Sequence, residues 1–473
     1  MDHRQTMLSQ IPKVDEVLDH PVVTEWLKQY PRKVVVEAIR RGLDRLRENL
    51  LSSSEPGIPD KTFFSVEKLL PVINEAIQDQ TALRLRRVIN ATGVVIHTNL
   101  GRSLLPSCAI AHMDEVSRRF CNLEYDLEEG TRGSRYVHVE EILCTLTGAE
   151  AALVVNNNAG AVLLVLNTLA EGKDVVVSRG QLVEIGGAFR VPDVMRRSGA
   201  HLVEVGTTNR TRPEDYDRAI GEETALLLKV HTSNFKIVGF TAEVALKDLV
   251  GLGRTRGIPV MEDLGSGCLV DLRRFGFTEE PLVQESIKTG ADVVTCSADK
   301  LLGGPQGGII LGRKDMIRRI RANPLNRALR IDKLTLAALE STLRLYLDEE
   351  KAFEEIPTLA MLTVSETSLV RKARRLARRI RSEVGDRFEV AVRRDSSQVG
   401  GGAYPLQELP TRVVSLRAKS VSSHDLETRL RAHRPPVITR IRRDELVLDL
   451  RTIQDDEFSL LAQALAHAVG VEG

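Results

Sequence analysis

The chain has 473 residues, of which 42% are hydrophobic and 28% are charged, the composition of a soluble globular protein with two or three domains. A net charge of +1 gives no overall electrostatic sign of nucleic-acid binding, and no apolar run approaches the roughly 18 residues of a membrane span. The start, MDHRQTMLSQIPKVDEVLDHP, carries acidic residues and lacks an apolar run, so no secretory signal is expected and a cytoplasmic enzyme is favoured.

Five cysteines are scattered along the chain without a Cys-x-x-Cys pair. An odd number without paired spacing argues against a disulfide framework and against a zinc site, so no metal is expected. Cys268 and Cys296 lie beside motifs discussed below. We interpret them as small buried apolar residues, with a part in the chemistry as the alternative.

The first 87 residues have a helical pattern interrupted by prolines and contain no enzyme-like motif. Pro31 leads into a helix with an apolar stripe, and a Ser-, Pro- and Gly-rich stretch at 52–60 precedes a further helix from Val66 to about Arg86. We expect a helical N-terminal domain over residues 1–60, which holds a macromolecular partner or mediates assembly, and a linker helix over residues 61–87.

Two stretches of the chain are rich in arginine. Arg40, Arg41, Arg45 and Arg47 cluster near the N-terminus, and a second run extends from Arg371 to Arg381. The ordinary interpretation of each is a solvated helix face, and the alternative is a surface that binds phosphates.

From Val88 onward, short β-branched runs alternate with helical patterns. This alternation predicts an α/β fold with a mostly parallel sheet covered on both faces, and polar motifs follow several strands where such sheets bind ligands. We expect a large domain over residues 88–335 and a smaller C-terminal α/β domain over residues 336–473. The expected strands of the large domain are 152–156, 174–178, 201–205, 225–230, 258–263, 292–297 and 307–312; the small domain is expected to hold strands at FEVAVRRD, TRVVSLRA and ELVLDL and helices at 367–384 and 456–469.

Lys300 stands after the expected strand VVTCS and before the glycine-rich LLGGPQGG. A lone lysine at a strand end is ordinarily a surface residue. Here Ser297, three residues earlier, is placed to give its hydroxyl to a phosphate, and the glycines let backbone pass close to a ligand. This combination predicts the Schiff-base lysine of a pyridoxal 5'-phosphate (PLP) enzyme.

Two further motifs fit the same cofactor. Asp263 ends the strand IPVMED, where a carboxylate would keep the pyridine nitrogen protonated; its alternative role is a turn or helix cap. Asn158, Ala159 and Gly160 form a small-residue turn before a helix, whose free N–H groups would complete a phosphate site with Ser297, although such turns also occur as simple caps. The residue that stacks on the ring stays open between Gln181 and Glu184.

Long and unusual strings within residues 87–330 resemble bacterial selenocysteine synthase, the L-seryl-tRNA(Sec) selenium transferase family, and the resemblance extends over nearly the full chain. The strings are RVINATGVVIHTNLGRSLLP (87–106), YDLEEGTRGSRYVHVE (125–140), VVNNNAG (154–160), SRGQLVEIGGAFRVPDVM (178–195), VGTTNRT (205–211), HTSNFKIVGF (231–240), EDLGSGCLVDL (262–272) and SADKLLGGPQGGIILGR (297–313). The resemblance implies the aspartate aminotransferase-like fold of fold-type I PLP enzymes.

The resemblance also implies an activity. Seryl-tRNA(Sec) would become selenocysteinyl-tRNA(Sec) through a PLP-bound aminoacrylyl intermediate, with selenophosphate as the selenium donor. Lys300, or its neighbour Asp299, would transfer the α-proton, and Arg102, Arg327 and Arg330 would bind selenophosphate. For Arg327 and Arg330 the alternative is one exposed helix face, since they are three residues apart. The family further implies a homodecamer whose dimers complete each other's sites, with tRNA held by the N-terminal domain.

Two other functions stay open at this point. One is a PLP-dependent lyase or aldolase that acts on a free small amino acid or a phosphorylated amino sugar, for which the N-terminal extension has no evident use. The other is a catalytically inactive tRNA-binding protein, against which the retained Lys300, Asp263 and Ser297 argue.

Overall fold

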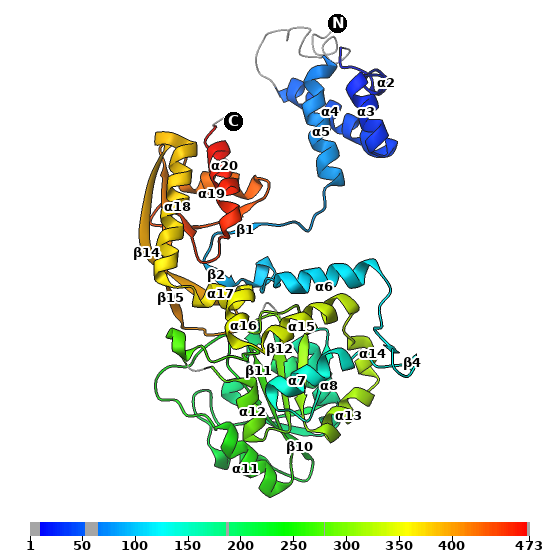
Figure 1. Cartoon of the computed structure of the whole chain (residues 1–473), viewed down its shortest axis with the longest axis vertical. Coiled ribbons are helices and arrows are strands. Elements are labelled where there is room, and N and C mark those ends of the chain that lie inside the picture. The colour runs from blue at the N-terminus through cyan, green and yellow to red at the C-terminus, as the bar shows by residue number, and fades with distance from the viewer. Residues whose placement is uncertain (1–9, 53–64, 186–188, 279, 471–473) are drawn as a thin grey trace. The chain divides into compact units, whose positions relative to one another are not determined.

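The computed structural model describes residues 10–52, 65–185, 189–278 and 280–470. The chain divides into two units, Met1–Arg87 and Val88–Gly473, which are described separately below (Figure 1). The expected boundary between residues 60 and 61 lies outside the described residues. In the part that is described, no helix is both long enough and apolar enough to cross a membrane.

The first unit is a small helical bundle with its own apolar core. Its helices are α2 (Val14–Leu18), α3 (Pro21–Gln29), α4 (Arg32–Ser52) and α5 (Val66–Thr81). Gly42 of α4 lets α5 come close, because a Cβ there would stand 3.1 Å from the Ile73 side chain. Helix α5 ends at Thr81 rather than near Arg86, and Leu83 and Leu85 beyond it are exposed.

The second unit is built on a seven-stranded sheet of order β5-β13-β12-β11-β10-β6-β9. Neighbouring strands are parallel except where β13 runs antiparallel to both β12 and β5. Strands β5, β13, β12 and β11 are buried along their whole length, although β5 lies at one edge, whereas β9 at the other edge is partly exposed. The strands are β5 (Ala151–Val155), β6 (Asp174–Ser178), β9 (His201–Val205), β10 (Thr224–Val230), β11 (Val260–Gly265), β12 (Val293–Ser297) and β13 (Gly308–Gly312).

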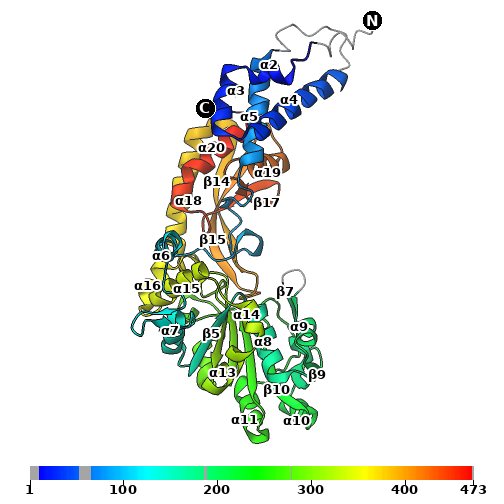
Figure 2. The same cartoon turned by 90° about the vertical axis from the view of Figure 1, so that its right-hand side faces the viewer.

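Helices cover both faces of this sheet (Figures 1 and 2). One apolar core joins the sheet to α8, α9 and α13, and two others join the opposite face to α7, α10, α11, α12 and α15. The helices of this part are α6 (Ser107–Arg118), α7 (Val137–Thr147), α8 (Asn158–Ala170), α9 (Val191–Arg197), α10 (Pro213–Ala219), α11 (Leu246–Arg256), α12 (Val283–Thr289), α13 (Lys314–Ala322), α14 (Leu325–Leu329) and α15 (Lys333–Leu345). The expected mostly parallel, doubly covered sheet is confirmed.

A second sheet, of order β17-β18-β15-β14-β2, forms the core of the C-terminal part, with α18, α19 and α20 packed on one face. Its edge strand β2 comes from the beginning of the unit and runs parallel to β14. The elements are β2 (Val94–Ile96), α16 (Glu349–Glu355), α17 (Pro357–Thr363), α18 (Glu366–Val384), β14 (Phe388–Gly400), β15 (Glu408–Ala418), α19 (Ser423–Ala432), β17 (Arg440–Arg442), β18 (Glu445–Asp449) and α20 (Phe458–Ala468). Short two-stranded pairs complete the unit: β1 (Ile89–Asn90) with β16 (Val437–Ile438), β3 (Tyr125–Asp126) with β4 (Thr131–Arg132), and β7 (Glu184–Ile185) with β8 (Phe189–Arg190).

The carboxylate of Asp449 is fully buried where β2 joins this sheet. It accepts hydrogen bonds from the Ser397 and Thr411 hydroxyls at 2.9 and 2.8 Å, and it pairs with Arg440 at 3.0 Å. Gly93, at φ +80°, lies so close that a Cβ would stand 2.1 Å from the Asp449 carboxylate. The backbone just before β2 therefore packs directly against this buried carboxylate, while β2 itself is held by its pairing with β14.

Candidate functional site

Lys300 lies in the turn that follows β12 and is only 6% exposed. The Ser103 hydroxyl donates to the carbonyls of Asp299 and Lys300, at 2.8 and 2.9 Å, and so fixes this turn. Burial lowers the pKa of the Lys300 amine, while the nearby Asp263 carboxylate opposes that shift. A buried lysine with a lowered pKa has the property that a nucleophilic or proton-transferring amine requires.

Asp263 lies on the neighbouring strand β11, with its carboxylate directed to the same site. The Asn158 amide and the Thr295 hydroxyl both donate to its Oδ1, at 2.9 and 3.0 Å. Burial raises the pKa of Asp263, against the effect of these two donors and of Lys300. Desolvation is the largest cause of this shift, which means that burial destabilises the ionised carboxylate. A cation beside it would therefore stabilise the ionised form strongly. A protonated pyridine nitrogen is such a cation.

The turn before α8 serves two purposes. Asn157 caps the helix, with its Oδ1 accepting the Gly160 N–H at 2.8 Å, and Asn158 directs its side chain to Asp263. The N–H groups of Asn158 and Ala159 have no acceptor among the described residues. The Ser297 hydroxyl likewise donates to no described residue. Helix α8 also packs against β12, which ends at Ser297. Of the three residues predicted to bind phosphate through this turn, Gly160 has its N–H already engaged.

The structure brings Arg102 together with Asp299. Arg102 adopts a left-handed backbone conformation, at φ +61°, and its Nη1 stands 2.6 Å from the Asp299 Oδ2. Asp299 is 6% exposed, and its carboxylate is among the charges that act on Lys300. Arg102, Asp299 and Lys300 therefore form one charged cluster.

Arg327 and Arg330 are exposed, and neither has an ion-pair partner in the described part of the chain. Arg330 follows the end of α14 in an extended conformation and pairs with Val155 through an isolated β-bridge. The Leu329 carbonyl accepts the Asn156 N–H at 2.9 Å. These contacts place Arg330 at the carboxyl end of β5, beside the turn that leads into α8, so the two arginines do not share one continuous helix.

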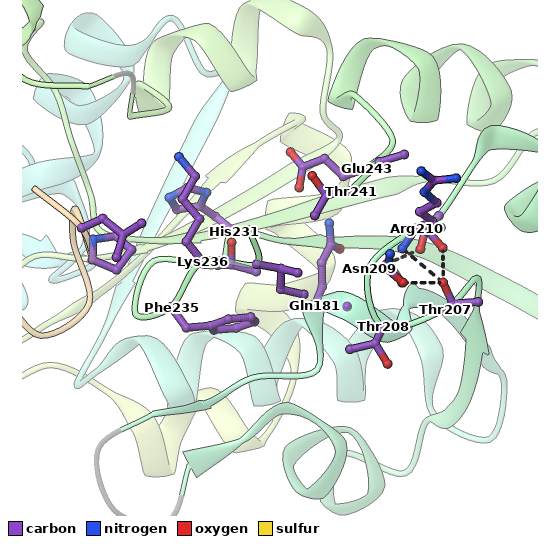
Figure 3. A pocket seen from close by; sticks show the side chains of 18 of the residues that line it. Gln181, Thr207, Thr208, Asn209, Arg210, His231, Phe235, Lys236, Thr241 and Glu243 are labelled. Atoms are coloured by element: carbon purple, nitrogen blue, oxygen red, sulfur yellow. Dashed lines mark hydrogen bonds between the residues drawn. The ribbon is translucent and has the colours of Figure 1, made fainter. Parts of the chain in front are cut away.

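A cavity of about 320 Å³ opens at the carboxyl end of β10 (Figure 3). Gln181, His231 and Glu280 line it, and the main-chain N–H of His231 donates to the Asp263 carbonyl at 2.8 Å. His231 Nε2 and Glu280 Oε1 stand 3.3 Å apart without a hydrogen bond to any described residue. This polar wall beside the Asp263 strand was not predicted from the sequence, although the string HTSNF marks its position.

Gln181 and Glu184 differ in their surroundings. Gln181 is buried in the cavity wall, with its Oε1 accepting the Val230 N–H at 3.0 Å. Glu184 is exposed and pairs with Arg190 at 2.7 Å. Of the two, Gln181 therefore lines this cavity and Glu184 does not, and the residue that stacks on the ring stays a prediction.

The two buried cysteines near the motifs lie in apolar surroundings. Burial raises the pKa of both Cys268 and Cys296 to about 12. A thiol with so high a pKa is protonated at neutral pH, and this supports the interpretation of both as packing residues.

Gly402 is a site residue that the sequence prediction missed. It has φ +85°, and a Cβ at this position would stand 2.4 Å from the Lys300 Nζ. The loop after β14 thus lies directly against the lysine amine. The Gly400-Gly401-Gly402 run is a signal that could have indicated a close approach.

We expect Gly402→Ala to reduce kcat about a hundredfold, the cost of displacing a catalytic group by about 1 Å. The added methyl would push the Lys300 amine aside and would also strain the backbone. Steady-state rates and the amount of cofactor bound per chain would measure this effect. Gly221→Ala is the matched control, because its Cβ would have no atom within 4 Å and activity should be unchanged. Equal rates for the two variants would contradict the contact with Lys300.

Two family models match the chain: "L-seryl-tRNA selenium transferase" over residues 88–454 and "Selenocysteine synthase N terminal" over residues 8–47. A protein of Geobacter metallireducens (strain ATCC 53774 / DSM 7210 / GS-15), named L-seryl-tRNA(Sec) selenium transferase, is 54% identical over 466 residues, which cover 98% of this chain and 99% of that protein. A protein of Clostridium botulinum (strain Okra / Type B1) with the same name is 50% identical over 463 residues, 98% of each chain.

Among solved structures, that of D-glucosaminate-6-phosphate ammonia-lyase is similar to this chain. It matches 83% of this chain and 99% of its own length, with a TM-score of 0.57 and 22% identity. At this identity the likeness shows a shared fold. Together with the family matches, it confirms the predicted α/β fold class.

Proposed function

The chain belongs to the L-seryl-tRNA selenium transferase family, and on that premise we propose that it converts seryl-tRNA(Sec) to selenocysteinyl-tRNA(Sec) with selenophosphate as the selenium donor. The observation that carries this proposal is the 54% identity to a transferase of that name over 98% of the chain. The protein is a PLP-dependent enzyme, like the other members of its family and like enzymes that share its fold.

The residues of the site fit PLP. Asp263 supplies a buried carboxylate for the pyridine nitrogen, Lys300 supplies a buried amine, and the N–H groups of Asn158 and Ala159 with the Ser297 hydroxyl are open to a phosphate. When bound, PLP supplies an electron sink for the negative charge that develops at the serine Cα. In our proposal Lys300 removes and returns the proton at that carbon, and its lowered pKa favours the neutral amine that accepts a proton.

The charged cluster around Arg102 supports the proposed route of selenium delivery. Selenophosphate carries several negative charges, and guanidinium groups bind its oxygen atoms in the forked geometry that carboxylates also accept. Arg102 is held by Asp299, so a bound anion competes with this carboxylate for the same guanidinium. Arg327 and Arg330 are exposed and would add two further guanidinium groups. Release of Asp299 from Arg102 would free it to act on protons beside Lys300.

We further propose that residues 1–60 form the tRNA-binding domain, 61–87 a linker helix, 88–335 the catalytic domain and 336–473 the small domain. The match to "Selenocysteine synthase N terminal" over residues 8–47 supports the first of these assignments. The Arg40–Arg47 cluster supports it weakly, since Arg41, Arg45 and Arg47 each face an acidic side chain at 2.8, 3.8 and 2.7 Å. A cytoplasmic homodecamer of five dimers remains part of the proposal.

The second candidate function is a lyase acting on a phosphorylated amino sugar or a free amino acid. The shared fold of the ammonia-lyase structure is the observation in its favour. The identity is 22% there and 54% to the transferase of Geobacter metallireducens, so we favour the selenium transferase.

The deciding experiment supplies the holoenzyme with seryl-tRNA(Sec) and selenophosphate and follows selenium incorporation into the aminoacyl group. Parallel reactions contain free serine, or a phosphorylated amino sugar, in place of the tRNA. We expect turnover with the tRNA ester alone. Turnover of the small substrates without turnover of the tRNA would establish the lyase instead, and binding of tRNA without any turnover would indicate an inactive binding protein.

A further inference from the structure

Helix α18 (Glu366–Val384) has two contrasting faces. Its apolar face is buried against α20 and the C-terminal sheet, and both views show α18 and α20 side by side (Figures 1 and 2). The opposite face is exposed and basic, and the acidic residues of the helix, Glu366 and Glu383, stand near its ends. The arginines of the exposed face are Arg371, Arg374, Arg375, Arg378, Arg379 and Arg381, and we call them the α18 basic face.

Few of these arginines are neutralised within the chain. Arg375 pairs with Asp455 at 2.8 Å, while Arg371 and Arg381 donate only to the uncharged Ser368 hydroxyl and Val390 carbonyl. Arg374, Arg378 and Arg379 have no ion-pair partner within residues 280–470 or the other described ranges. The cluster on α4, by contrast, is largely paired with acids of its own unit. Of the two basic runs, the one on α18 is therefore the better candidate for a phosphate-binding surface.

The spacing of the α18 basic face also brings like charges together. Arg374 and Arg378 are one turn apart, as are Arg371 and Arg375, and like charges at this spacing destabilise a helix. The face extends over about 15 Å of helix, since ten residue steps at 1.5 Å separate Arg371 from Arg381. A single small anion cannot span that length. An extended polyanion can neutralise the whole row.

We propose that the α18 basic face binds the phosphate backbone of the tRNA substrate. This inference rests on the proposed function, which supplies a ligand that carries one negative charge per nucleotide. Exposed arginines in a row contact phosphates along a duplex and recognise its shape rather than its sequence. The face would therefore add affinity and orientation for the body of the tRNA without selecting one tRNA over another.

The test compares the full-length holoenzyme with Arg374→Gln/Arg378→Gln, which removes two unpaired charges and keeps helix propensity. Seryl-tRNA(Sec) affinity is measured as a function of salt concentration. We expect binding at least tenfold weaker at about 0.15 M salt and a slope of log K against log salt smaller by about two, one for each lost phosphate contact. Arg374→Lys/Arg378→Lys keeps both charges and should recover most of the affinity and the slope.

Arg218→Gln/Arg254→Gln is the matched control, because it removes two exposed arginines from α10 and α11. The inference is overturned when the α18 variant binds tRNA with the affinity and salt slope of this control. The same conclusion holds when the α18 variant keeps its affinity for tRNA but binds an acidic protein more weakly than the control does. A wild-type enzyme that neither binds nor converts seryl-tRNA(Sec) would refute the proposed function itself. If the wild type converts seryl-tRNA(Sec) normally and the α18 variant has the tRNA affinity and salt slope of the control, only the present inference is refuted.

Discussion

Replacing Lys300 by Ala is expected to reduce the rate of selenium incorporation at least about a thousandfold, within the range for loss of a proton-transfer group. Lys300 is the buried amine at the end of β12, and Asp263 and Asp299 are among the charges that act on it. Among the described residues no other lysine forms an ion pair with Asp263 or Asp299. The variant should also lose the covalent link between protein and PLP, which borohydride reduction and mass measurement detect.

Lys333→Ala is the control for this substitution. Lys333 is half-buried, and its Nζ donates to the Val116 carbonyl at 2.8 Å, away from the charged cluster. This variant should retain its activity and its covalently held cofactor. A Lys300→Ala enzyme that kept a rate within tenfold of wild type, or kept the covalent link, would disprove the central role of Lys300.

The largest expected loss of stability comes from Asp449→Ala. This change leaves the Ser397 and Thr411 hydroxyls and the Arg440 guanidinium without the carboxylate that they share. Each of the two buried hydroxyls loses its acceptor, at a cost of about 1–3 kcal/mol, whereas Arg440 is partly exposed and keeps its pair with Asp395 at 3.1 Å. The chain has two units and its unfolding need not be two-state, so hydrogen exchange at β14, β15 and β18 is the suitable measurement.

Asp386→Ala is the matched control in the same part of the chain. Its carboxylate is almost wholly exposed and stands 3.6 Å from the Lys419 amine. Surface pairs of this kind contribute little, so exchange should be nearly unchanged. Equal exchange rates in the two variants would mean that the Asp449 contacts do not stabilise the C-terminal sheet.

The sequence predicted the helices and strands of this fold well, because local patterns of apolar and polar residues encode them. The strands at 174–178 and 201–205 have the predicted bounds, and the helix predicted over 367–384 begins one residue earlier, at Glu366. The family and the PLP fold followed from strings that stay contiguous in the chain, and both are confirmed. The individual roles of Asp299, Arg102 and the other site residues remain predictions.

Contacts between distant segments were not accessible to the same reasoning. Nothing in a turn before a helix indicates that Asn158 will donate to Asp263, 105 residues later. The approach of Gly402 to Lys300 depends on how a loop of the C-terminal part folds back over the large sheet. Pairing of the arginines on α4 likewise depends partly on α5, which supplies Glu75. Such features follow from tertiary packing, which periodicity does not specify.

The placement of β2 has a consequence for how the protein is made. Strand β2 ends at Ile96, and its partner β14 begins at Phe388, so 292 residues of synthesis separate the two. At about 5–20 residues per second, a ribosome needs roughly 15–60 s for that distance. During this interval an apolar strand emerges without its sheet, and its unpaired edge is open to pairing with other chains. We expect nascent chains that stop before β14 to engage chaperones through residues 88–96, and chains that extend past β18 to release them.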